Sequence, residues 1–236
     1  MILSAVLVSL IAVSQVAPRQ ADSTTIAGLP VVEVPAAGSA ASTFAVILSG
    51  DGGWAAGDRS MASALVGHGI GVVGLDVPSY LREKRTPDGV GADLTRLLSH
   101  YLGAWHKTRI ILIGYSHGAD IAPFMVSRLP PTLRSRIDLV ALLGLEKSAN
   151  FQFHLEDLVA DVAHDDAVPV LPELEKLRGM PLLCVKGEGD THSLCGALPP
   201  SLARVETRPG GHRISGRQGS AIVEMILGAV RPKKTH

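Results

Sequence analysis

This sequence of 236 residues has no excess of positive or negative charge, few cysteines and few long apolar runs. Lys and Arg together number 22 and so do Asp and Glu, with neither a basic stripe nor an acidic tail. A protein that binds nucleic acid concentrates positive charge on one surface, so this balance argues against nucleic acid as the main partner. The chain is long enough for one domain to bury a hydrophobic core without disulfide staples.

The apolar runs are too short to span a bilayer comfortably, both near the N-terminus and further along the chain. Residues 1–20 are typical of an export signal and leader, because Ile2 to Val13 is largely apolar and Ala12-Val13-Ser14 offers small residues at a cleavage site. No Lys or Arg precedes this run, which leaves an N-terminal anchor or a misassigned start as alternatives. We expect an exported, periplasmic protein whose single domain spans residues 21–236.

The two cysteines, Cys184 and Cys195, lie within one short stretch. Export makes a disulfide between them plausible, and closing such a loop would stabilise the fold by about 3 kcal/mol in the chain-entropy model. Two unpaired thiols are the alternative, because sequence does not show their geometry.

Paired metal-ligand motifs are also lacking. His154, His164, Asp165 and Asp166 lie in one segment, but no spacing such as His-Glu-x-x-His occurs. We therefore expect neither a metal nor another cofactor.

Apolar segments alternate with segments of helical spacing along most of the chain. The predicted strands are residues 29–34, 44–48, 69–77, 109–116, 137–145, 180–185 and 203–207, and the predicted helices are 58–67, 86–105, 119–129 and 220–230. We expect residues 29–34 to form an edge strand and Asp58 to cap its helix. Since parallel neighbours need helical crossovers and these strands show no polar side, the pattern predicts an α/β fold with a mostly parallel central sheet and helices on both faces. Residues 146–179 interrupt this alternation of strands and helices, and within them residues 151–159 are a candidate lid.

The strand 109–116 ends in Gly114-Tyr115-Ser116-His117-Gly118, and a segment with helical spacing follows without a gap. This Gly-x-Ser-x-Gly between strand and helix is the nucleophile elbow of serine hydrolases with an α/β-hydrolase fold. Glycines flank the serine because the turn is tight, and the serine is held in strained geometry with its hydroxyl exposed. We therefore predict Ser116 as a nucleophile.

A serine hydroxyl needs a base, and the base needs an orienting acid. In α/β-hydrolases the acid follows a late strand and the histidine follows the last one, positions that Asp190 and His212 occupy. Glu188 lies two residues from Asp190 and is the alternative acid. His117 adjoins Ser116, but adjacent side chains diverge at a sharp turn. A bridge between Cys184 and Cys195 would tether the loop that carries the acid.

The developing oxyanion needs donors that are fixed before the reaction starts. One is expected from the backbone of His117, directly after the nucleophile, and the other from Asp51 or Gly52 in the glycine-rich loop after residues 44–48. Asp51, Asp58 and Asp120 also lie near the predicted mouth. They are either solvated loop carboxylates or binding groups for a cationic, amine-bearing substrate.

Several motifs in combination resemble the VirJ/AcvB family of bacterial virulence proteins, in its short, single-domain VirJ form. They are Ser49-Gly50-Asp51-Gly52-Gly53-Trp54 with Asp58, Gly114-Tyr115-Ser116-His117-Gly118-Ala119-Asp120 followed by Pro123, the two cysteines around Gly187 and Asp190, and Pro209-Gly210-Gly211-His212. The similarity runs from about Phe44 to the C-terminus. The sequence departs from the family at Arg213, where a second histidine is frequent, and at His117, where an aromatic residue is common.

The resemblance implies a periplasmic hydrolase that cleaves the aminoacyl ester of lysyl-phosphatidylglycerol, with Ser116 as nucleophile, His212 as base and Asp190 as acid. It further implies docking to an aminoacylated phospholipid headgroup at a membrane surface, and a link to virulence and to type IV secretion components. Two alternatives remain open. One is an esterase, thioesterase or amidase for a soluble substrate, and the other is a non-catalytic periplasmic protein that assists secretion.

Overall fold

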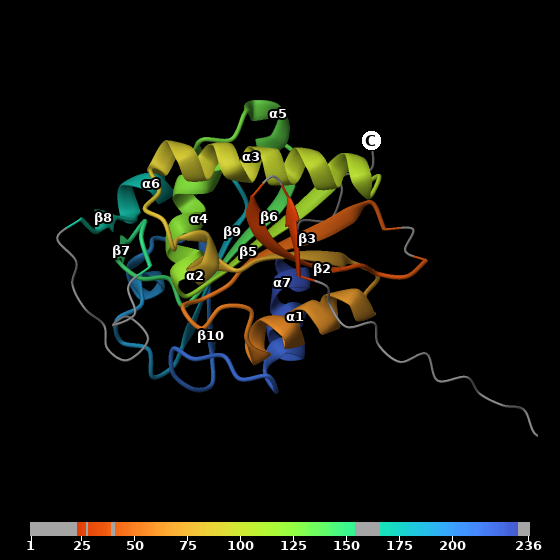
Figure 1. Cartoon of the computed structure of the whole chain (residues 1–236). Coiled ribbons are helices and arrows are strands. Elements are labelled where there is room, and N and C mark those ends of the chain that lie inside the picture. The colour runs from red at the N-terminus through yellow and green to blue at the C-terminus, as the bar shows by residue number, and fades with distance from the viewer. Residues whose placement is uncertain (1–22, 27, 39–40, 154–165, 231–236) are drawn as a thin grey trace, which may run out of the picture.

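The computed structural model describes residues 23–26, 28–38, 41–153 and 166–230. The predicted export signal and residues 154–165, which include residues 154–159 of the candidate lid, lie outside these ranges. A sheet of eight strands, in the order β1-β2-β4-β3-β5-β6-β9-β10, forms the centre of the molecule (Figure 1). Its strands are β1 (Ser23–Ile26), β2 (Leu29–Val34), β3 (Thr43–Leu48), β4 (Gly71–Leu75), β5 (Arg109–Tyr115), β6 (Ile137–Leu143), β9 (Leu182–Gly187) and β10 (Arg204–Arg208).

All neighbours from β4 to β10 pair in parallel, whereas β2 pairs antiparallel with both β4 and β1. The fold therefore agrees with the predicted mostly parallel sheet. The chain leaves the central strand β3 for β4 on one side and returns to β5 on the other, so the direction of winding reverses beside β5. In sheets of this kind, ligands bind at the carboxyl ends of the strands near such a reversal.

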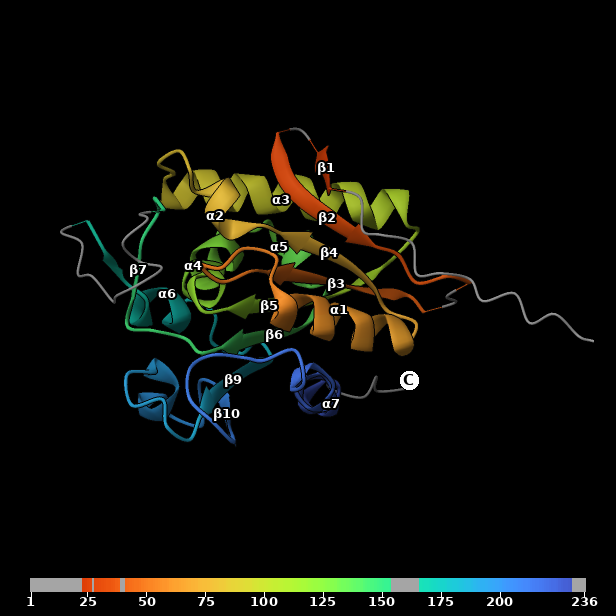
Figure 2. The ribbon, with the colours of Figure 1, turned by 60° about the horizontal axis from the view of Figure 1, so that its bottom comes forward.

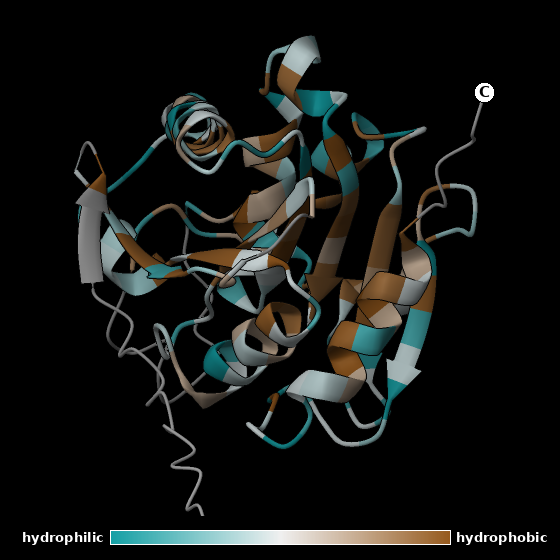
Figure 3. Cartoon of the chain, turned by 90° about the vertical axis from the view of Figure 1, so that its right-hand side faces the viewer, coloured by the Kyte–Doolittle hydropathy of each residue, from teal (hydrophilic) through white to brown (hydrophobic). Residues whose placement is uncertain are grey.

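Helices cover both faces of the sheet (Figures 1 and 2). One face carries α3 (Pro87–Ala104), α4 (His117–Ser127), α6 (Leu171–Glu175) and the short α2 (Val77–Tyr80) and α5 (Pro131–Arg134), and the other face carries α1 (Ala56–Gly67) and α7 (Gly219–Ala229). Hydrophobic residues fill the space between sheet and helices, as the brown strands and inward helix faces in Figure 3 show. Successive β3 residues alternate between the two cores, Phe44 and Val46 toward α3 and α4, Ala45 and Ile47 toward α1 and α7.

The interruption at residues 146–179 contains a two-stranded ribbon of β7 (Ser148–Ala149) and β8 (Val168–Pro169). Phe151, at the start of the candidate lid, is buried. Its ring packs edge-on against that of Phe124 on α4, with ring centroids 5.0 Å apart. Its carbonyl oxygen accepts a hydrogen bond from the Arg85 backbone. This part of the candidate lid is thus packed into the core.

Two local predictions were wrong. Residues 29–34 form a strand but not the edge, because the four-residue β1 pairs outside β2. Asp58 is not the first residue of α1 or its N-cap: the helix begins at Ala56, and the Asp58 carboxylate reaches back to the backbone N–H of Ala55 at 3.0 Å. A side chain in the third helical position satisfies the exposed N–H of the capping residue in this way.

Candidate active site

The nucleophile elbow joins β5 to α4. Ser116 has φ 51° and ψ −125°, a left-handed backbone conformation that costs energy in any residue with a side chain. The two flanking glycines permit this turn: a Cβ at Gly114 would lie 2.5 Å from the Gly118 carbonyl oxygen, and a Cβ at Gly118 would lie 2.2 Å from the Leu48 carbonyl oxygen. The backbone at Gly114 therefore packs against Gly118, and the backbone at Gly118 packs against the end of β3.

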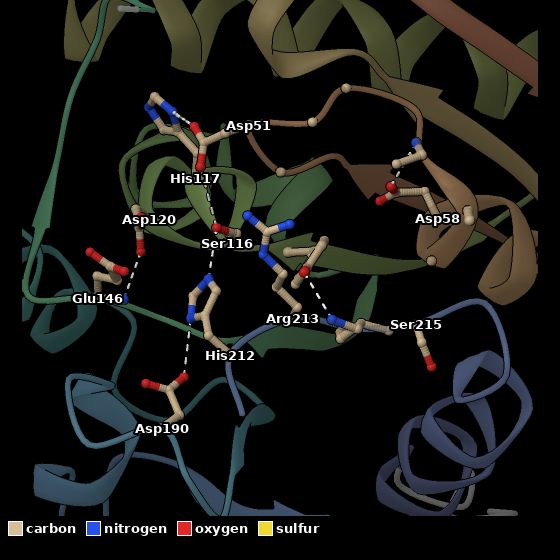
Figure 4. Close-up of a pocket in the computed structure, with 18 of the residues that line it drawn as sticks. Asp51, Asp58, Ser116, His117, Asp120, Glu146, Asp190, His212, Arg213 and Ser215 are labelled. Carbon is tan, nitrogen blue, oxygen red and sulfur yellow. Dashed lines mark hydrogen bonds and ion pairs between the residues drawn. The ribbon is translucent and has the colours of Figure 1, made fainter. Parts of the chain in front are cut away.

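The structure brings the three predicted catalytic side chains together (Figure 4). His212 Nε2 lies 2.9 Å from Ser116 Oγ, and His212 Nδ1 lies 3.1 Å from Asp190 Oδ2. Asp190 is 6% exposed and its other oxygen accepts from the Ser193 backbone at 3.2 Å. Glu188, the alternative acid, is exposed to solvent. The Ser–His–Asp chain of contacts is the arrangement in which a histidine can take the serine proton while the acid orients the ring.

The loop that carries His212 is held by Arg208, the last residue of β10. Its guanidinium donates to the carbonyl oxygens of Gly211 at 2.7 Å, of His212 at 2.8 Å, and of Pro209 and Arg213 at 3.1 Å each. This residue is 4% exposed, and burial lowers its pKa. The sequence did not indicate this role of Arg208, because the acceptors are backbone atoms that have no signature in the sequence.

Two further contacts fix the imidazole. The Tyr115 ring stacks on His212 with centroids 6.3 Å apart, and its hydroxyl accepts from the Ile214 backbone at 3.0 Å. Gly144, which follows β6, has φ +68°, and a Cβ there would lie 2.9 Å from His212 Cε1. The His212 ring thus packs against Tyr115 and Gly144, while Arg208 holds the backbone that carries it.

The predicted disulfide is confirmed. Cys184 in β9 and Cys195 in the 3₁₀ helix η2 (Leu194–Ala197) are both fully buried, with Cα atoms 5.5 Å apart. The loop between them carries Asp190 and Ser193. Ser193 Oγ also donates to the Leu145 carbonyl oxygen at 3.0 Å, so the acid loop is tied to both β9 and the end of β6.

The glycine-rich loop after β3 packs directly on the elbow. A Cβ at Gly50 would lie 3.1 Å from the Cβ of Ser116, and the loop closes through a hydrogen bond from Gly53 N–H to the Gly50 carbonyl oxygen at 3.0 Å. Over the described ranges, the backbone N–H groups of His117, Asp51 and Gly52 meet no protein acceptor. The predicted oxyanion donors therefore remain free to bind a ligand oxygen.

Asp51 also places its side chain in the site. Its Oδ1 lies 2.8 Å from His117 Nδ1, and its Oδ2 accepts from Ser116 Oγ at 3.4 Å. The other ring nitrogen, His117 Nε2, lies 2.8 Å from the Asn150 carbonyl oxygen. The His117 ring thus turns away from Ser116, as the sequence predicted, but it contacts Asp51 and Asn150, which the sequence did not indicate.

The other two predicted acids differ in setting. Asp120, on α4, is 6% exposed and its Oδ1 accepts from the Glu146 backbone at 2.7 Å. Burial raises the pKa of Asp120 well above its ordinary value, and the neighbouring Glu146 and Asp51 raise it further. Asp58, whose carboxylate accepts from the Ala55 backbone, lies on the other side of Ser116 from Asp120 in Figure 4. Burial raises the pKa of Asp58 to about 6.

A cavity of about 630 Å³ opens over Ser116. Its walls come from the loop after β3, the start of α1, the elbow, the segment that follows β6, and the loops that carry Asp190 and His212. The charged or titratable lining residues are Asp51, Asp58, Asp120, Glu146, Asp190, Tyr115, His117, His192, His212 and Arg213. Over the described ranges, His, Cys, Asp and Glu side chains form no group that could hold a metal ion. No helix in the same part of the chain has the length and hydropathy to cross a membrane.

Fold and site together define a member of the α/β-hydrolase class. Solved structures with the same fold include Est1E from Butyrivibrio proteoclasticus (TM-score 0.62, 12% identity, 89% of this chain and 98% of that chain) and MenH from S. aureus (TM-score 0.61, 16% identity, 84% and 97%). Within this class the chain belongs to the VirJ family, described as bacterial virulence protein (VirJ), whose model matches residues 42–234.

A curated relative points to ester chemistry. The carboxylesterase Culp1 of Mycobacterium tuberculosis (strain ATCC 25618 / H37Rv) is 31% identical over 137 residues, which cover 52% of this chain and 62% of that protein. The chain therefore spans less than two thirds of this relative's length. Together, the family and this distant relative suggest a hydrolase of the esterase type.

Proposed function

We propose that the protein is a serine hydrolase that cleaves the aminoacyl ester of an aminoacylated phospholipid, with lysyl-phosphatidylglycerol as the substrate that the family resemblance favours. The observation that supports hydrolysis is the continuous contact from Asp190 through His212 to Ser116, at 3.1 and 2.9 Å. A binding protein that had lost catalysis would have no need for a strained serine aligned with a buried acid–histidine pair.

In the proposed reaction, Ser116 Oγ attacks the ester carbonyl carbon while His212 Nε2 takes its proton. The carbonyl oxygen becomes an oxyanion that the free N–H groups of His117 and of Asp51 or Gly52 stabilise. The tetrahedral intermediate collapses as His212 returns the proton to the glycerol oxygen, the acyl carbon–oxygen bond breaks, and phosphatidylglycerol leaves. Water then hydrolyses the acyl-serine by the same route, which releases the free amino acid and regenerates Ser116.

Asp51 supports an aminoacyl group. Its Oδ2 is 3.4 Å from Ser116 Oγ, and the α-amino group of an aminoacyl ester is bonded to the carbon next to the attacked carbonyl. An α-ammonium in this position comes within hydrogen-bond reach of the carboxylate, which makes a charge-assisted contact. Glu146 adds a carboxylate to the same cavity and Asp120 adds an acid whose raised pKa a bound cation would lower, so the two suit a second ammonium, such as the ε-ammonium of lysine.

Arg213 supports a phosphate on the leaving group. It directly follows the residue that protonates the leaving oxygen, it is exposed, and it lines the cavity. Figure 4 draws its guanidinium between Ser116 and Asp58, away from Asp120 and Glu146. A substrate with ammonium groups on its acyl half and a phosphodiester on its alcohol half matches this separation of charge.

The test has two assays on the purified protein. Mass spectrometry measures the release of lysine from lysyl-phosphatidylglycerol in detergent micelles, and a fluorophosphonate probe reports whether the nucleophilic serine is labelled. We expect labelling and lysine release by the wild type, and neither by folded Ser116→Ala; His212→Ala should release no lysine. Failure of the wild type to label, while a known serine hydrolase labels in parallel, would reject hydrolysis. Labelling and cleavage of soluble esters without lysine release would favour the soluble-substrate alternative.

The cellular setting is part of the same proposal. We propose a periplasmic location, which agrees with the disulfide, since such bonds persist in oxidising compartments. A membrane-surface substrate is accessible there. In cells, deletion of the gene should raise the amount of aminoacylated phosphatidylglycerol, and complementation with Ser116→Ala should not lower it. An association with type IV secretion components is proposed on the family resemblance alone.

A further inference from the structure

The His117 side chain is enclosed between two oxygen acceptors. It is 6% exposed, with Nδ1 2.8 Å from the Asp51 carboxylate and Nε2 2.8 Å from the Asn150 carbonyl oxygen. A neutral imidazole has one N–H and can satisfy only one of these acceptors, whereas the imidazolium has two. The geometry therefore requires the charged form of His117.

The groups that face this ring explain how a buried charge is tolerated. Burial by itself lowers the pKa of His117, but the hydrogen bond and charge of Asp51, the carbonyl of Asn150 and the charge of Asp120 outweigh it and raise the pKa to about 9. Asp51 lies on the loop after β3, Asp120 on α4 and Asn150 after β7. The ring thus links three elements around the nucleophile.

The pairing determines how Asp51 is presented to the site. One carboxylate oxygen is fixed by His117, and the other faces Ser116 Oγ at 3.4 Å. Over the described ranges, no other side chain donates to this carboxylate. A lone carboxylate at this distance would oppose the negative charge that develops on the substrate, but the ion pair carries no net charge.

We infer that His117 is a positioning residue: its imidazolium holds Asp51 with Oδ2 toward the ester, so that the Asp51–His117 pair selects esters that carry an α-ammonium over plain acyl esters. The inference rests on the proposed function, because it assumes that an ester is hydrolysed at Ser116. It adds a residue that determines specificity through the conformation and charge of another side chain.

The experiment compares lysine methyl ester with the matched methyl ester that lacks the α-amino group, and reports the ratio of their kcat/KM values. The variants are His117→Phe, which removes both donors from an aromatic ring of similar size, and His117→Gln, which keeps one neutral donor. Asp51→Asn removes the carboxylate itself. His100→Phe, at an exposed position on α3, controls for the exchange of histidine by phenylalanine.

We expect the wild type and His100→Phe to prefer the lysine ester. The ratio should fall about tenfold or more in Asp51→Asn and His117→Phe, with a smaller fall in His117→Gln, because a charge-assisted contact to the α-ammonium is lost or loosened. His117 and Asp51 also supply proposed oxyanion donors, so any general loss of catalysis should lower the kcat/KM for both esters equally and cancel in the ratio.

Equal losses on both esters in His117→Phe and His117→Gln would overturn the inference, because they would show that the ring only shapes the elbow. An unchanged ratio in both folded variants, beside a lowered ratio in Asp51→Asn, would also overturn it. If His117→Phe fails to fold in thermal melts, His117→Gln decides. Cleavage of both esters by the wild type without preference would overturn the inference as well, because the pair would then select nothing. Failure of the proposed function is a different result: the wild type would then cleave neither ester.

Discussion

Gly144 lies so close to the His212 imidazole that a Cβ at this position would be 2.9 Å from Cε1. The contact leaves no room for a methyl group unless the ring moves. Gly144 also has φ +68°, which a residue with a side chain adopts only with strain. The position of the proposed base, His212, thus depends partly on the absence of a side chain at Gly144, which follows a different strand.

We predict that Gly144→Ala lowers kcat on any ester by on the order of 100-fold, since a displacement of about 1 Å at a catalytic group has an effect of this size. Steady-state kinetics measures the change. Gly103→Ala is the matched control, because a Cβ at Gly103 on α3 meets nothing within 4 Å. Equal activities of the two variants would contradict the role of Gly144.

Arg208→Lys should loosen the His212 loop. A lysine places one compact ammonium where the guanidinium fork contacts four carbonyl oxygens, so most of these hydrogen bonds are lost. We expect kcat to fall at least about tenfold and the free energy of unfolding to fall by about 1–3 kcal/mol, from urea denaturation. Arg204→Lys, at an exposed position on the same strand, should leave both unchanged.

Replacing both Cys184 and Cys195 by alanine should reduce stability and activity together. Loss of the bridge should lower the free energy of unfolding by about 3 kcal/mol, in the chain-entropy model. The loop that carries Asp190 would then be less restrained, so kcat should also fall in conditions where the variant is fully folded. Reduced stability with an unchanged kcat would mean that the disulfide only stabilises.

Asp58→Asn should alter the dependence of stability on pH. The folded-state pKa of Asp58 is raised from 3.8 to about 6, chiefly by burial, so the protonated form is favoured in the folded protein and its stabilisation is lost as pH rises from about 4 through 6. The variant minus wild-type difference in unfolding free energy should therefore increase by about 2 kcal/mol between pH 4 and pH 8. Urea denaturation at both pH values measures it, with exposed Asp88→Asn as control.

Arg213→Gln should separate lipid from soluble substrates. If the guanidinium binds the phosphodiester of the headgroup, the KM for lysyl-phosphatidylglycerol should rise about tenfold while the KM for lysine methyl ester stays unchanged. Arg217→Gln removes an exposed charge from the same loop and is the control for a general effect on micelle binding. A similar change in both variants would assign the effect to surface charge.

The strands and the elbow could be predicted because their information is local. Apolar runs such as residues 44–48 and 109–113 are followed within two residues by glycine, and the Ser116 turn needs glycine two residues before and two residues after the serine. The four-residue β1 could not be predicted in the same way, since it is a strand only because β2 offers it a partner. Asp58 was misjudged because residue type alone does not separate an N-cap from the third position of a helix.

The site was predictable in its order along the chain but not in its contacts. Asp190 and Glu188 follow the same strand, and the structure turns Asp190 inward where Gly187 packs on the Gly210 and Gly211 backbone, a contact between distant segments. The roles of Arg208, Gly144 and the His117 ring depend on such contacts too. For Arg208 and His117 the acceptors include backbone carbonyl oxygens, which leave no trace in the residue types.

The fit of Gly118 against the Leu48 carbonyl oxygen has a consequence for how this site could diversify. The contact fixes the position of the nucleophile, Ser116, relative to the end of β3. The loop that supplies the proposed oxyanion donors follows β3, so the nucleophile and these donors keep one fixed geometry. The segment after β6 meets the elbow and its helix through hydrogen bonds, from the Glu146 backbone to Asp120 and between the Asn150 carbonyl oxygen and His117. Substrate preference can therefore change through that segment while the hydrolytic geometry is inherited intact.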